Sequence, residues 1–344
     1  MFLFKCFYVL ELEVIYKFSD LPKHEFIIGG KNMLYKDWLN EWLNNYIKPT
    51  CKIRTFERYS QLINKHIISA IGYYDLKDLT PCLIQKFISD LLTNGNLRTS
   101  QGLSANTINC AISVIQGSLK MAYMLEYTKV YIGDKIIRPK LIEKKVSCFT
   151  IQEQEKIEKY IISSNKRKLY GIILCIYSGI RLGELLALEI KDIDFVKSVI
   201  HINKSCHDSP KGRIIETPKS TNSNRVIPIP KQILPYLKEL KRNSNCCYLI
   251  AENNKPLSVR SYQRSFELLL KKLHIEHKGF HSLRHTFATR ALECGMDVKT
   301  LSEILGHKNP TITLNRYAHS MFEHKQLMMN KLGKNLYKKS TDIE

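Results

Sequence analysis

Apolar residues recur every three or four positions over residues 33–132. Two of these series are Trp38, Trp42 and Tyr46, and later Leu83, Phe87 and Leu91. Such spacing is typical of helices that bury one face. Gly72, Gly95 and Gly102 interrupt the pattern and mark connections. We therefore predict a small all-helical domain with four helices of moderate length.

Two helix starts in this region carry capping signals. Thr80 is followed by Pro81, and Pro is favoured at the first helical position because its missing N–H would have no partner there. Ser104 precedes the periodic stretch 108–123 and has a hydroxyl that can accept a hydrogen bond from a free backbone N–H. The sequence thus predicts helices that begin after Thr80 and after Ser104.

The helical periodicity stops near residue 133 and resumes near residue 150. Arg138 precedes Pro139, which disfavours a continuing helix. Thr150 and Glu153 then have the spacing of a capping box, which starts a new helix. We predict an N-terminal extension of unclear role over residues 1–32, a linker over 133–148, a second domain over 149–320 and a tail over 321–344.

The second domain begins with helical patterns and then changes period. Helices are predicted over residues 152–163, 167–177, 182–188, 282–294 and 298–305. Residues 194–203 and 214–230 are rich in β-branched side chains, and the polar residues 218–224 divide the second stretch. The expected fold class is mainly α, with an all-helical domain and a mixed α+β domain that contains a small antiparallel sheet of about three strands.

The charge balance indicates a polyanionic partner. The 344 residues include 53 Lys and Arg against 32 Asp and Glu, which gives a net charge of +21. The hydrophobic share of 44% is enough for a core in each domain and excludes a mainly disordered chain. The ten Cys form no CxxC pair, which argues against a zinc ribbon and a disulfide scaffold.

No membrane segment is expected. No stretch approaches the roughly 20 apolar residues that a membrane-spanning helix needs. Lys5, Glu11 and Glu13 interrupt the apolar N-terminal stretch, and no small-residue cleavage site follows it. We expect reduced thiols and a cytoplasmic, nucleoid-associated protein.

Five short islands of the second domain carry residues suited to phosphate chemistry. They are Ser178-Gly-Ile-Arg181-Leu-Gly-Glu184, Thr217-Pro-Lys219-Ser, His281-Ser-Leu-Arg284-His285, Leu305-Gly-His307 and Asn315-Arg316-Tyr317. Phosphoryl transfer needs positive charge near the non-bridging oxygens, a nucleophile and a proton donor for the leaving oxygen. Two Arg, two His, one Lys and one Tyr supply this set without a carboxylate cluster.

The order Arg, Lys, His-x-x-Arg, Leu-Gly-His, Tyr in these islands resembles the tyrosine recombinases, the family of phage and transposon integrases. The resemblance covers residues 150–320, and the helical region in front is similar to the family's core-binding domain. It implies the DNA breaking-rejoining enzyme fold. It also implies site-specific recombination through a 3′-phosphotyrosine intermediate, with integration or excision of a conjugative transposon or prophage as the setting.

The resemblance assigns catalytic roles to six residues, which are Arg181, Lys219, His281, Arg284, His307 and Tyr317. The two arginines would clamp the scissile phosphate, the tyrosine would attack it, and the lysine would protonate the leaving 5′ oxygen. The first histidine would transfer a proton and the second would contact the phosphate. Glu184 would support the fold.

The residues by themselves leave other interpretations open. Arg181 could be a surface side chain paired with Glu184. Lys219 could be an ordinary turn lysine, and Tyr317 a packed aromatic residue. His307 could cap the C terminus of the preceding helix. Other basic residues could also compete for the role of the lysine, and these are Lys204, Lys211 and Arg225.

A metal or cofactor is not expected. His281 and His285 have the i, i+4 spacing of a metal-binding pair, but neither a general-base Glu nor a third ligand accompanies them. In the mechanism that the resemblance implies, the phosphotyrosine ester conserves the energy of the phosphodiester. ATP would therefore not be needed.

The resemblance further implies double-stranded DNA with specific recombination sites as the partner, a homotetramer in the synaptic complex and an accessory DNA-bending or excision factor. Candidate phosphate contacts in the helical domain are Lys52, Arg54, Arg58, Lys65, Lys86 and Arg98. Alternative functions are a cellular resolving recombinase, a type IB topoisomerase and a catalytically silent DNA-binding regulator.

The tail carries an apolar stripe. Met321, Met328, Leu332 and Leu336 recur at spacings of seven, four and four, which predicts one face of a helix. That face could complete the core of its own domain. Because tails after the nucleophile often dock on a neighbouring protomer in the resembling family, we predict a protomer-docking helix.

Overall fold

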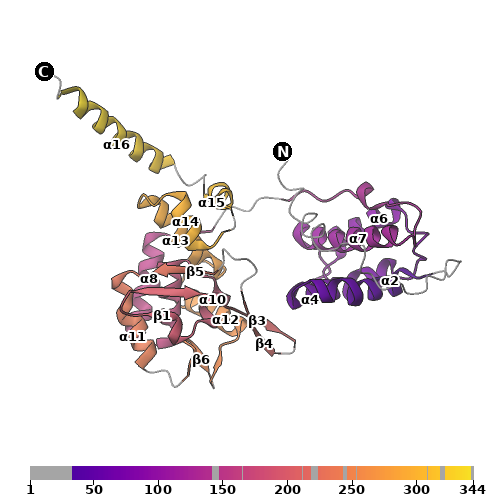
Figure 1. Ribbon diagram of the computed structural model, residues 1–344, viewed down its shortest axis with the longest axis horizontal. Coiled ribbons are helices and arrows are strands. Elements are labelled where there is room, and N and C mark those ends of the chain that lie inside the picture. The colour runs from indigo at the N-terminus through magenta and orange to yellow at the C-terminus, as the bar shows by residue number, and fades with distance from the viewer. Residues whose placement is uncertain are drawn as a thin grey trace, which may run out of the picture. The chain divides into compact units, whose positions relative to one another are not determined.

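The computed structural model describes residues 33–141, 147–164, 166–210, 212–217, 224–242, 246–252, 254–307, 309–317 and 322–341. The chain divides into two compact units, with the division between residues 142 and 143 (Figure 1). The described part of the first unit is helical. The second unit combines helices with short antiparallel strands.

Four helical rods form the described part of the first unit, as the apolar spacing predicts. In the first rod, α2 (Tyr35–Trp42) continues through the π-turn η1 (Leu43–Ile47) into α3 (Lys48–Thr50). In the second rod, α4 (Ile53–Leu62) continues through η2 (Ile63–Ile67) into α5 (Ile68–Ile71). The other two are α6 (Pro81–Asn94) and α7 (Ala105–Met124).

The capping predictions for α6 and α7 are confirmed. The Thr80 hydroxyl accepts a hydrogen bond from the backbone N–H of Leu83 at 3.2 Å. The Ser104 hydroxyl accepts one from the N–H of Thr107 at 3.3 Å. Each bond satisfies one of the N–H groups that the first helical turn leaves without a partner.

Part of the segment for which we predict a linker packs on α7. The short 3-10 helix η3 (Gly133–Lys135) is followed by Ile136, which is buried in the helical core. The Arg138 guanidinium donates to the Asn109 carbonyl at 3.1 Å, the Ser113 hydroxyl at 3.2 Å and the Gln116 side-chain oxygen at 2.5 Å. These contacts attach the start of the segment to the first unit.

The second unit begins with helices that surround a buried central helix. The capping box before α8 (Ile151–Ser164) is confirmed, because Thr150 and Glu153 exchange hydrogen bonds of 2.8 and 3.1 Å. After η4 (Arg167–Leu169), the central helix α9 (Tyr170–Ser178) is apolar on nearly every side. The short helices α10 (Leu182–Ala187) and η5 (Ile190–Asp192) follow.

The strands form one three-stranded sheet and two ribbons in the described residues. The sheet has the antiparallel order β1 (Ile193–Asp194), β2 (Val199–Ile202), β5 (Arg225–Pro228), with Ile200 opposite Ile227. The ribbons are β3 (Ser205–Ser209) with β4 (Gly212–Glu216), and β6 (Ala251–Glu252) with β7 (Lys255–Pro256).

The prediction of one sheet is therefore only partly right. The segment at 214–216 pairs with β3 and does not join the β1-β2-β5 sheet. The sequence of β3, Ser-Cys-His-Asp-Ser, lacks the apolar alternation that indicates a strand. The hydrophobic pattern therefore could not predict β3 as the pairing partner of β4.

The remaining helices carry the chain to its C-terminal part. They are η7 (Lys231–Ile233), α11 (Leu234–Arg242), α12 (Val259–Lys272), α13 (His281–Glu293), α14 (Val298–Leu305), α15 (Pro310–Tyr317) and α16 (Phe322–Thr341). Gly306, in the left-handed region with a φ of 66°, ends α14 directly after the predicted helix 298–305. Among the described helices, none combines the length and apolarity that crossing a bilayer requires.

Candidate active site

Arg181 is positioned by a tight turn between α9 and α10. Gly179 ends α9 with a φ of 63°, and a Cβ at this position would lie 2.4 Å from a ring carbon of Phe287. Only glycine suits both the conformation and the space. The turn then presents Arg181 as the N-cap residue of α10, with 36% of its side chain exposed.

Glu184 is a buried carboxylate between two arginines. It accepts hydrogen bonds from the Arg181 backbone N–H at 2.9 Å and from the Arg181 Nη1 at 2.7 Å. The Arg225 guanidinium donates to both of its oxygens, at 3.1 and 2.9 Å. Burial would raise the pKa of the Glu184 carboxyl, but the hydrogen bonds and charges of Arg225 and Arg181 outweigh burial and hold the pKa at about 2.

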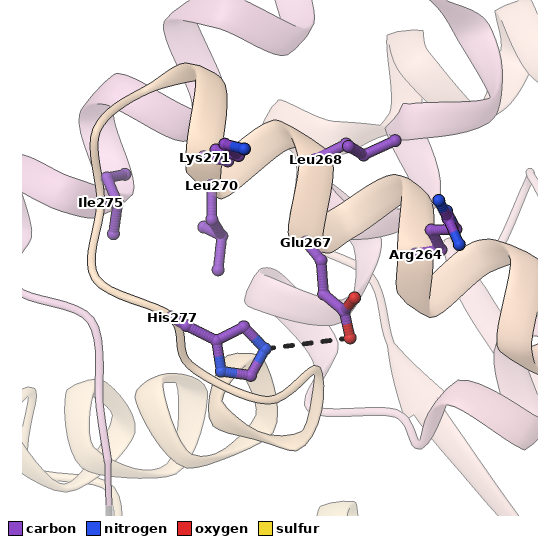
Figure 2. A pocket seen from close by; sticks show the side chains of 7 residues that line it. All are labelled: Arg264, Glu267, Leu268, Leu270, Lys271, Ile275 and His277. Carbon is purple, nitrogen blue, oxygen red and sulfur yellow. Dashed lines mark ion pairs between the residues drawn. The ribbon is translucent and has the colours of Figure 1, made fainter.

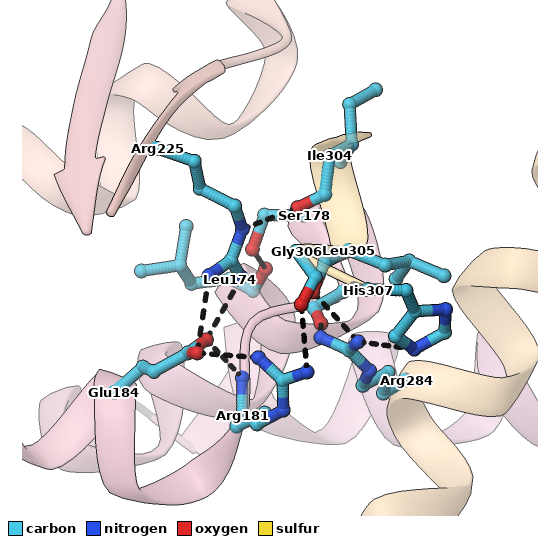
Figure 3. A network of polar contacts seen from close by, with 11 residues as sticks. Leu174, Ser178, Arg181, Glu184, Arg225, Arg284, Ile304, Leu305, Gly306 and His307 are labelled. Carbon is cyan, nitrogen blue, oxygen red and sulfur yellow. Dashed lines mark hydrogen bonds and ion pairs between the residues drawn. The ribbon is translucent and has the colours of Figure 1, made fainter. Parts of the chain in front are cut away.

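Three arginines converge on the C terminus of α14 (Figure 3). Arg225 Nε donates to the Ile304 carbonyl at 2.6 Å, and Arg284 Nη2 donates to the Leu305 carbonyl at 2.7 Å. The third contact joins Arg181 Nη2 to the Gly306 carbonyl at 3.3 Å. The last carbonyls of a helix have no partner within it and form the negative end of its dipole. This terminus therefore holds guanidinium groups from the N-cap of α10, from α13 and from β5.

Arg284 and His307 are linked directly. Arg284 is only 2% exposed, and its Nη1 donates to the Gly179 carbonyl at 2.9 Å. Its Nη2 lies 2.8 Å from Nε2 of the His307 ring. The other ring nitrogen, Nδ1, lies 2.7 Å from the hydroxyl oxygen of Thr313. The His307 ring thus lies between α13 and α15.

This arrangement gathers positive charge. Three guanidinium groups and the Glu184 carboxylate meet in the network that the described residues form. Several guanidinium groups held close together attract an anion. Planar guanidinium groups suit the paired oxygens of a phosphate.

The structure brings together Arg181, Arg284 and His307 of the six predicted residues. His281 is the exposed first residue of α13, three residues before Arg284, and its ring contacts His285 edge-on with centroids 4.6 Å apart. Lys219 lies outside the described residues. Tyr317 is the last residue of α15, and its side chain lies outside the described part.

Sequence reasoning missed one member of the network and underrated two others. Arg225 entered only as a competitor for the role of Lys219, because it opens a β-branched run that indicated a strand. Thr313 gave no signal except its position six residues after His307. Glu184 does pair with Arg181, as the surface interpretation of that arginine suggested, but the carboxylate is buried, at 5% exposure.

A pocket beside α12 does not belong to this network. It contains an ion pair of 3.8 Å between His277 and Glu267 (Figure 2). Its lining residues are Arg264, Glu267, Leu268, Leu270, Lys271, Ile275 and His277, and none of them is a predicted site residue. Within the described residues, no three His, Cys, Asp or Glu side chains are grouped so that they could hold a metal ion.

The sequence matches the phage integrase family over residues 149–324, and the N-terminal SAM-like domain of phage integrases over residues 34–92. The first match covers more than half of the chain, so the protein belongs to the phage integrase family. Its relatives are named tyrosine recombinases, transposases and integrases. The chain is accordingly a tyrosine recombinase, an enzyme of site-specific DNA recombination.

Individual relatives cover different shares of the chain. A tyrosine recombinase XerC-like protein of Caldanaerobacter subterraneus subsp. tengcongensis is 26% identical over 88% of this chain and 85% of its own length. The ICEBs1 integrase of Bacillus subtilis is 26% identical over 81% of this chain and 78% of its own. The transposase of transposon Tn916 from Enterococcus faecalis is 30% identical over 54% of this chain and 51% of its own.

Solved structures share the fold. The Tn1549 transposon integrase in complex with a circular intermediate DNA superposes with a TM-score of 0.74 at 21% identity, over 87% of this chain and 99% of that chain. A lambda integrase dimer bound to a core site gives a TM-score of 0.66 at 19% identity, over 83% of this chain and 95% of that chain. The predicted fold class, mainly helical with a small antiparallel sheet, is confirmed.

Proposed function

We propose that this recombinase cuts and rejoins double-stranded DNA at specific sites with Tyr317 as the nucleophile, and that its task is to integrate or excise a mobile element. One observation carries the proposal. Arg181, Arg284 and His307 converge at the C terminus of α14, directly before the helix that ends at Tyr317.

The scissile phosphate would bind to the two arginines. Arg284 is buried and held by two backbone carbonyls, and Arg181 is held by Glu184 and the Gly306 carbonyl. Both guanidinium groups are therefore oriented before DNA arrives. Such preorganised charge stabilises the negative charge that develops on the non-bridging oxygens in the transition state.

The chemistry would proceed by exchange of one ester for another. The Tyr317 oxygen attacks the phosphorus, the bond from phosphorus to the 5′ oxygen breaks, and Lys219 gives that oxygen a proton. His281 would handle the proton that the phenol loses, because a phenol with a pKa near 10 is a weak nucleophile at neutral pH. Attack by a 5′ hydroxyl on the phosphotyrosine then rejoins the strand.

The relatives support the choice of substrate and assembly. The Tn1549 integrase structure contains a circular intermediate DNA, and a lambda integrase tetramer is bound to a Holliday junction. By analogy we infer duplex DNA and a homotetramer for this chain, with action at the nucleoid and an accessory DNA-bending or excision factor. The transposon and ICEBs1 relatives favour a mobile element, whereas the XerC-like relative supports a cellular resolving recombinase as the alternative.

The first unit would add phosphate contacts along α4. Arg54 and Arg58 are exposed and one helical turn apart. Burial lowers the pKa of His66, and the charges of Lys65 and Arg58 lower it further, so positive charge gathers at this end of the rod. The other proposed contacts are Lys52, Lys65, Lys86 and Arg98.

A nicked duplex tests the proposed function. The duplex is taken from the ends of the element that carries the gene, with the nick beside the cleavage site, so that the released fragment diffuses away and the covalent protein–DNA adduct accumulates. We expect an adduct without ATP and in excess EDTA. Loss of the adduct in EDTA would revive the metal interpretation of His281 and His285.

Variants at two arginines sharpen this test. Arg284→Lys should slow adduct formation by at least about 100-fold, because a lysine cannot hold the two carbonyls and the His307 ring at once. Arg264→Lys, at an exposed position on α12, is the matched control and should react at the normal rate. If the protein binds the duplex specifically but never forms an adduct with it, the result would instead support a catalytically silent regulator.

A further inference from the structure

The His307 ring contacts Arg284 and Thr313, which differ in hydrogen-bonding ability. Arg284 has only N–H donors, so the His307 Nε2 that lies 2.8 Å from it must accept. In the neutral ring the proton is then on Nδ1. Nδ1 lies 2.7 Å from the Thr313 hydroxyl oxygen. The Nδ1–H group therefore donates a hydrogen bond, and the hydroxyl oxygen accepts it. The two contacts together define one tautomer.

Thr313 has a suitable position for this role. Its side chain is fully buried, at 0% exposure, within α15. His307 itself is fixed at the end of α14, where its backbone N–H donates to the Ser302 carbonyl at 3.0 Å. The bond from His307 to Thr313 therefore joins the end of α14 to the helix that ends, one turn after Thr313, at Tyr317.

We propose that Thr313 is a positioning residue of the recombination reaction, which holds His307 in the Nδ1–H tautomer so that Nε2 accepts from Arg284 and keeps that guanidinium oriented toward the phosphate site. Without the hydroxyl, the proton is free to move to Nε2. Two donors would then face each other at the contact between His307 and Arg284, and the ring or the guanidinium would turn away. The inference rests on the proposed role of His307.

Single-turnover adduct formation on the nicked duplex tests the hydroxyl. Thr313→Val keeps the shape but loses the acceptor, and we expect it to react about tenfold more slowly, in line with one lost hydrogen bond. Thr313→Ser keeps the acceptor and should stay within about twofold of the wild-type rate. Thr311→Val, at an exposed position on the same helix, is the control and should be unaffected.

A double-mutant cycle separates positioning from packing. In a His307→Ala background, Thr313→Val should cause no further loss, because the ring it positions is absent. A tenfold loss that persists without His307 would mean that Thr313 acts through packing of α15, and it would overturn the inference. An equal rate for Thr313→Val and the wild type would also overturn it.

Nitrogen-15 NMR of histidine-labelled protein reads the tautomer itself, with the His307→Ala variant used for assignment. We expect the Nδ1–H form in the wild type and a redistribution in Thr313→Val. The same tautomer in both proteins would contradict the inference. If His307→Ala alone reacts at the normal rate, the proposed role of His307 fails as well. If His307→Ala is slow and Thr313→Val is normal, only the role of Thr313 fails.

Discussion

Glu184 is a buried carboxylate that pairs with two arginines of the site, and its ionisation stabilises the folded protein. Its pKa is about 2 in the folded state against an ordinary 4.5. A group with a lowered folded pKa contributes stability that is complete above the unfolded pKa and is lost as the pH falls toward the folded pKa. The contribution is about 3 kcal/mol at neutral pH.

Glu184→Gln should therefore be less stable than the wild type at pH 7, and the difference should shrink as the pH falls from about 5 toward 2. Urea unfolding of both proteins at several pH values measures this. Glu252→Gln, at an exposed position in β6, should leave the pH profile unchanged. A Glu184→Gln deficit that does not vary with pH would contradict the ionic role of the carboxylate.

Lys219 is assigned as the general acid by the family motif alone. If it protonates the leaving 5′ oxygen, Lys219→Ala should cut an ordinary strand much more slowly than the wild type does. The defect should be far smaller on a strand with sulfur in place of the 5′ oxygen, because a thiolate leaves without a proton. Lys231→Ala, at an exposed position in η7, is the control. An equal defect on both substrates would assign the acid to another residue.

The site could be predicted from the sequence where a residue belongs to a short motif. Arg181, Arg284 and His307 each belong to one, and the structure joins them in one network. The pairing of Arg225 with Glu184 and the contact of Thr313 with His307 could not be predicted, because they depend on contacts with α10 and with the end of α14 that exist only after folding.

At the scale of elements, Gly183 allows the β3–β4 ribbon to lie against α10. A Cβ at Gly183 would come within 2.6 Å of the Cys206 carbonyl oxygen and of the Ser205 hydroxyl oxygen. Gly183→Ala should therefore push the ribbon away and destabilise the protein by about 1–3 kcal/mol. Urea unfolding checks this value.

Gly279→Ala is the matched control, because a Cβ there would have no neighbour within 4 Å and the residue needs no left-handed backbone conformation. It should leave the free energy of unfolding unchanged or slightly higher. Equal effects at the two glycines would contradict the close approach of β3 to α10.

Local signals explain why most elements could be predicted. The hydroxyls of Thr80 and Ser104 and the capping box of Thr150 lie within three residues of the groups they bind, so the sequence alone reveals them. The partner of β4 could not be identified, because strand pairing is decided by contacts between segments and β3 is polar.

The helix α16 supplies the next prediction. Of the predicted apolar stripe, Leu332 and Leu336 are exposed at 50% and 61%, Met328 is half-buried and Met321 lies outside the described residues, while the neighbouring Met329 is 65% exposed. If this apolar surface docks on a neighbouring protomer, truncation after Ser320 should leave a folded protein that binds one DNA site but synapses and recombines poorly. Gel-shift and recombination assays measure the two steps. A lower melting temperature together with lost single-site binding would show that the helix completes its own domain.

For the whole molecule, the net charge of +21 and the converging arginines have one common explanation, a DNA backbone as substrate. Charge alone would serve a binding protein as well as an enzyme. Covalent chemistry at the proposed nucleophile Tyr317, the residue with which α15 ends, would separate the two.

The most direct measurement of the central claim is therefore the identity of the residue that holds the DNA. The adduct formed on the nicked duplex is digested with nuclease and protease, and mass spectrometry locates the phosphonucleotide. We predict that it lies on Tyr317, and that Tyr317→Phe binds the same DNA with normal affinity but forms no adduct. An adduct on another residue, or undiminished recombination by Tyr317→Phe, would contradict the account.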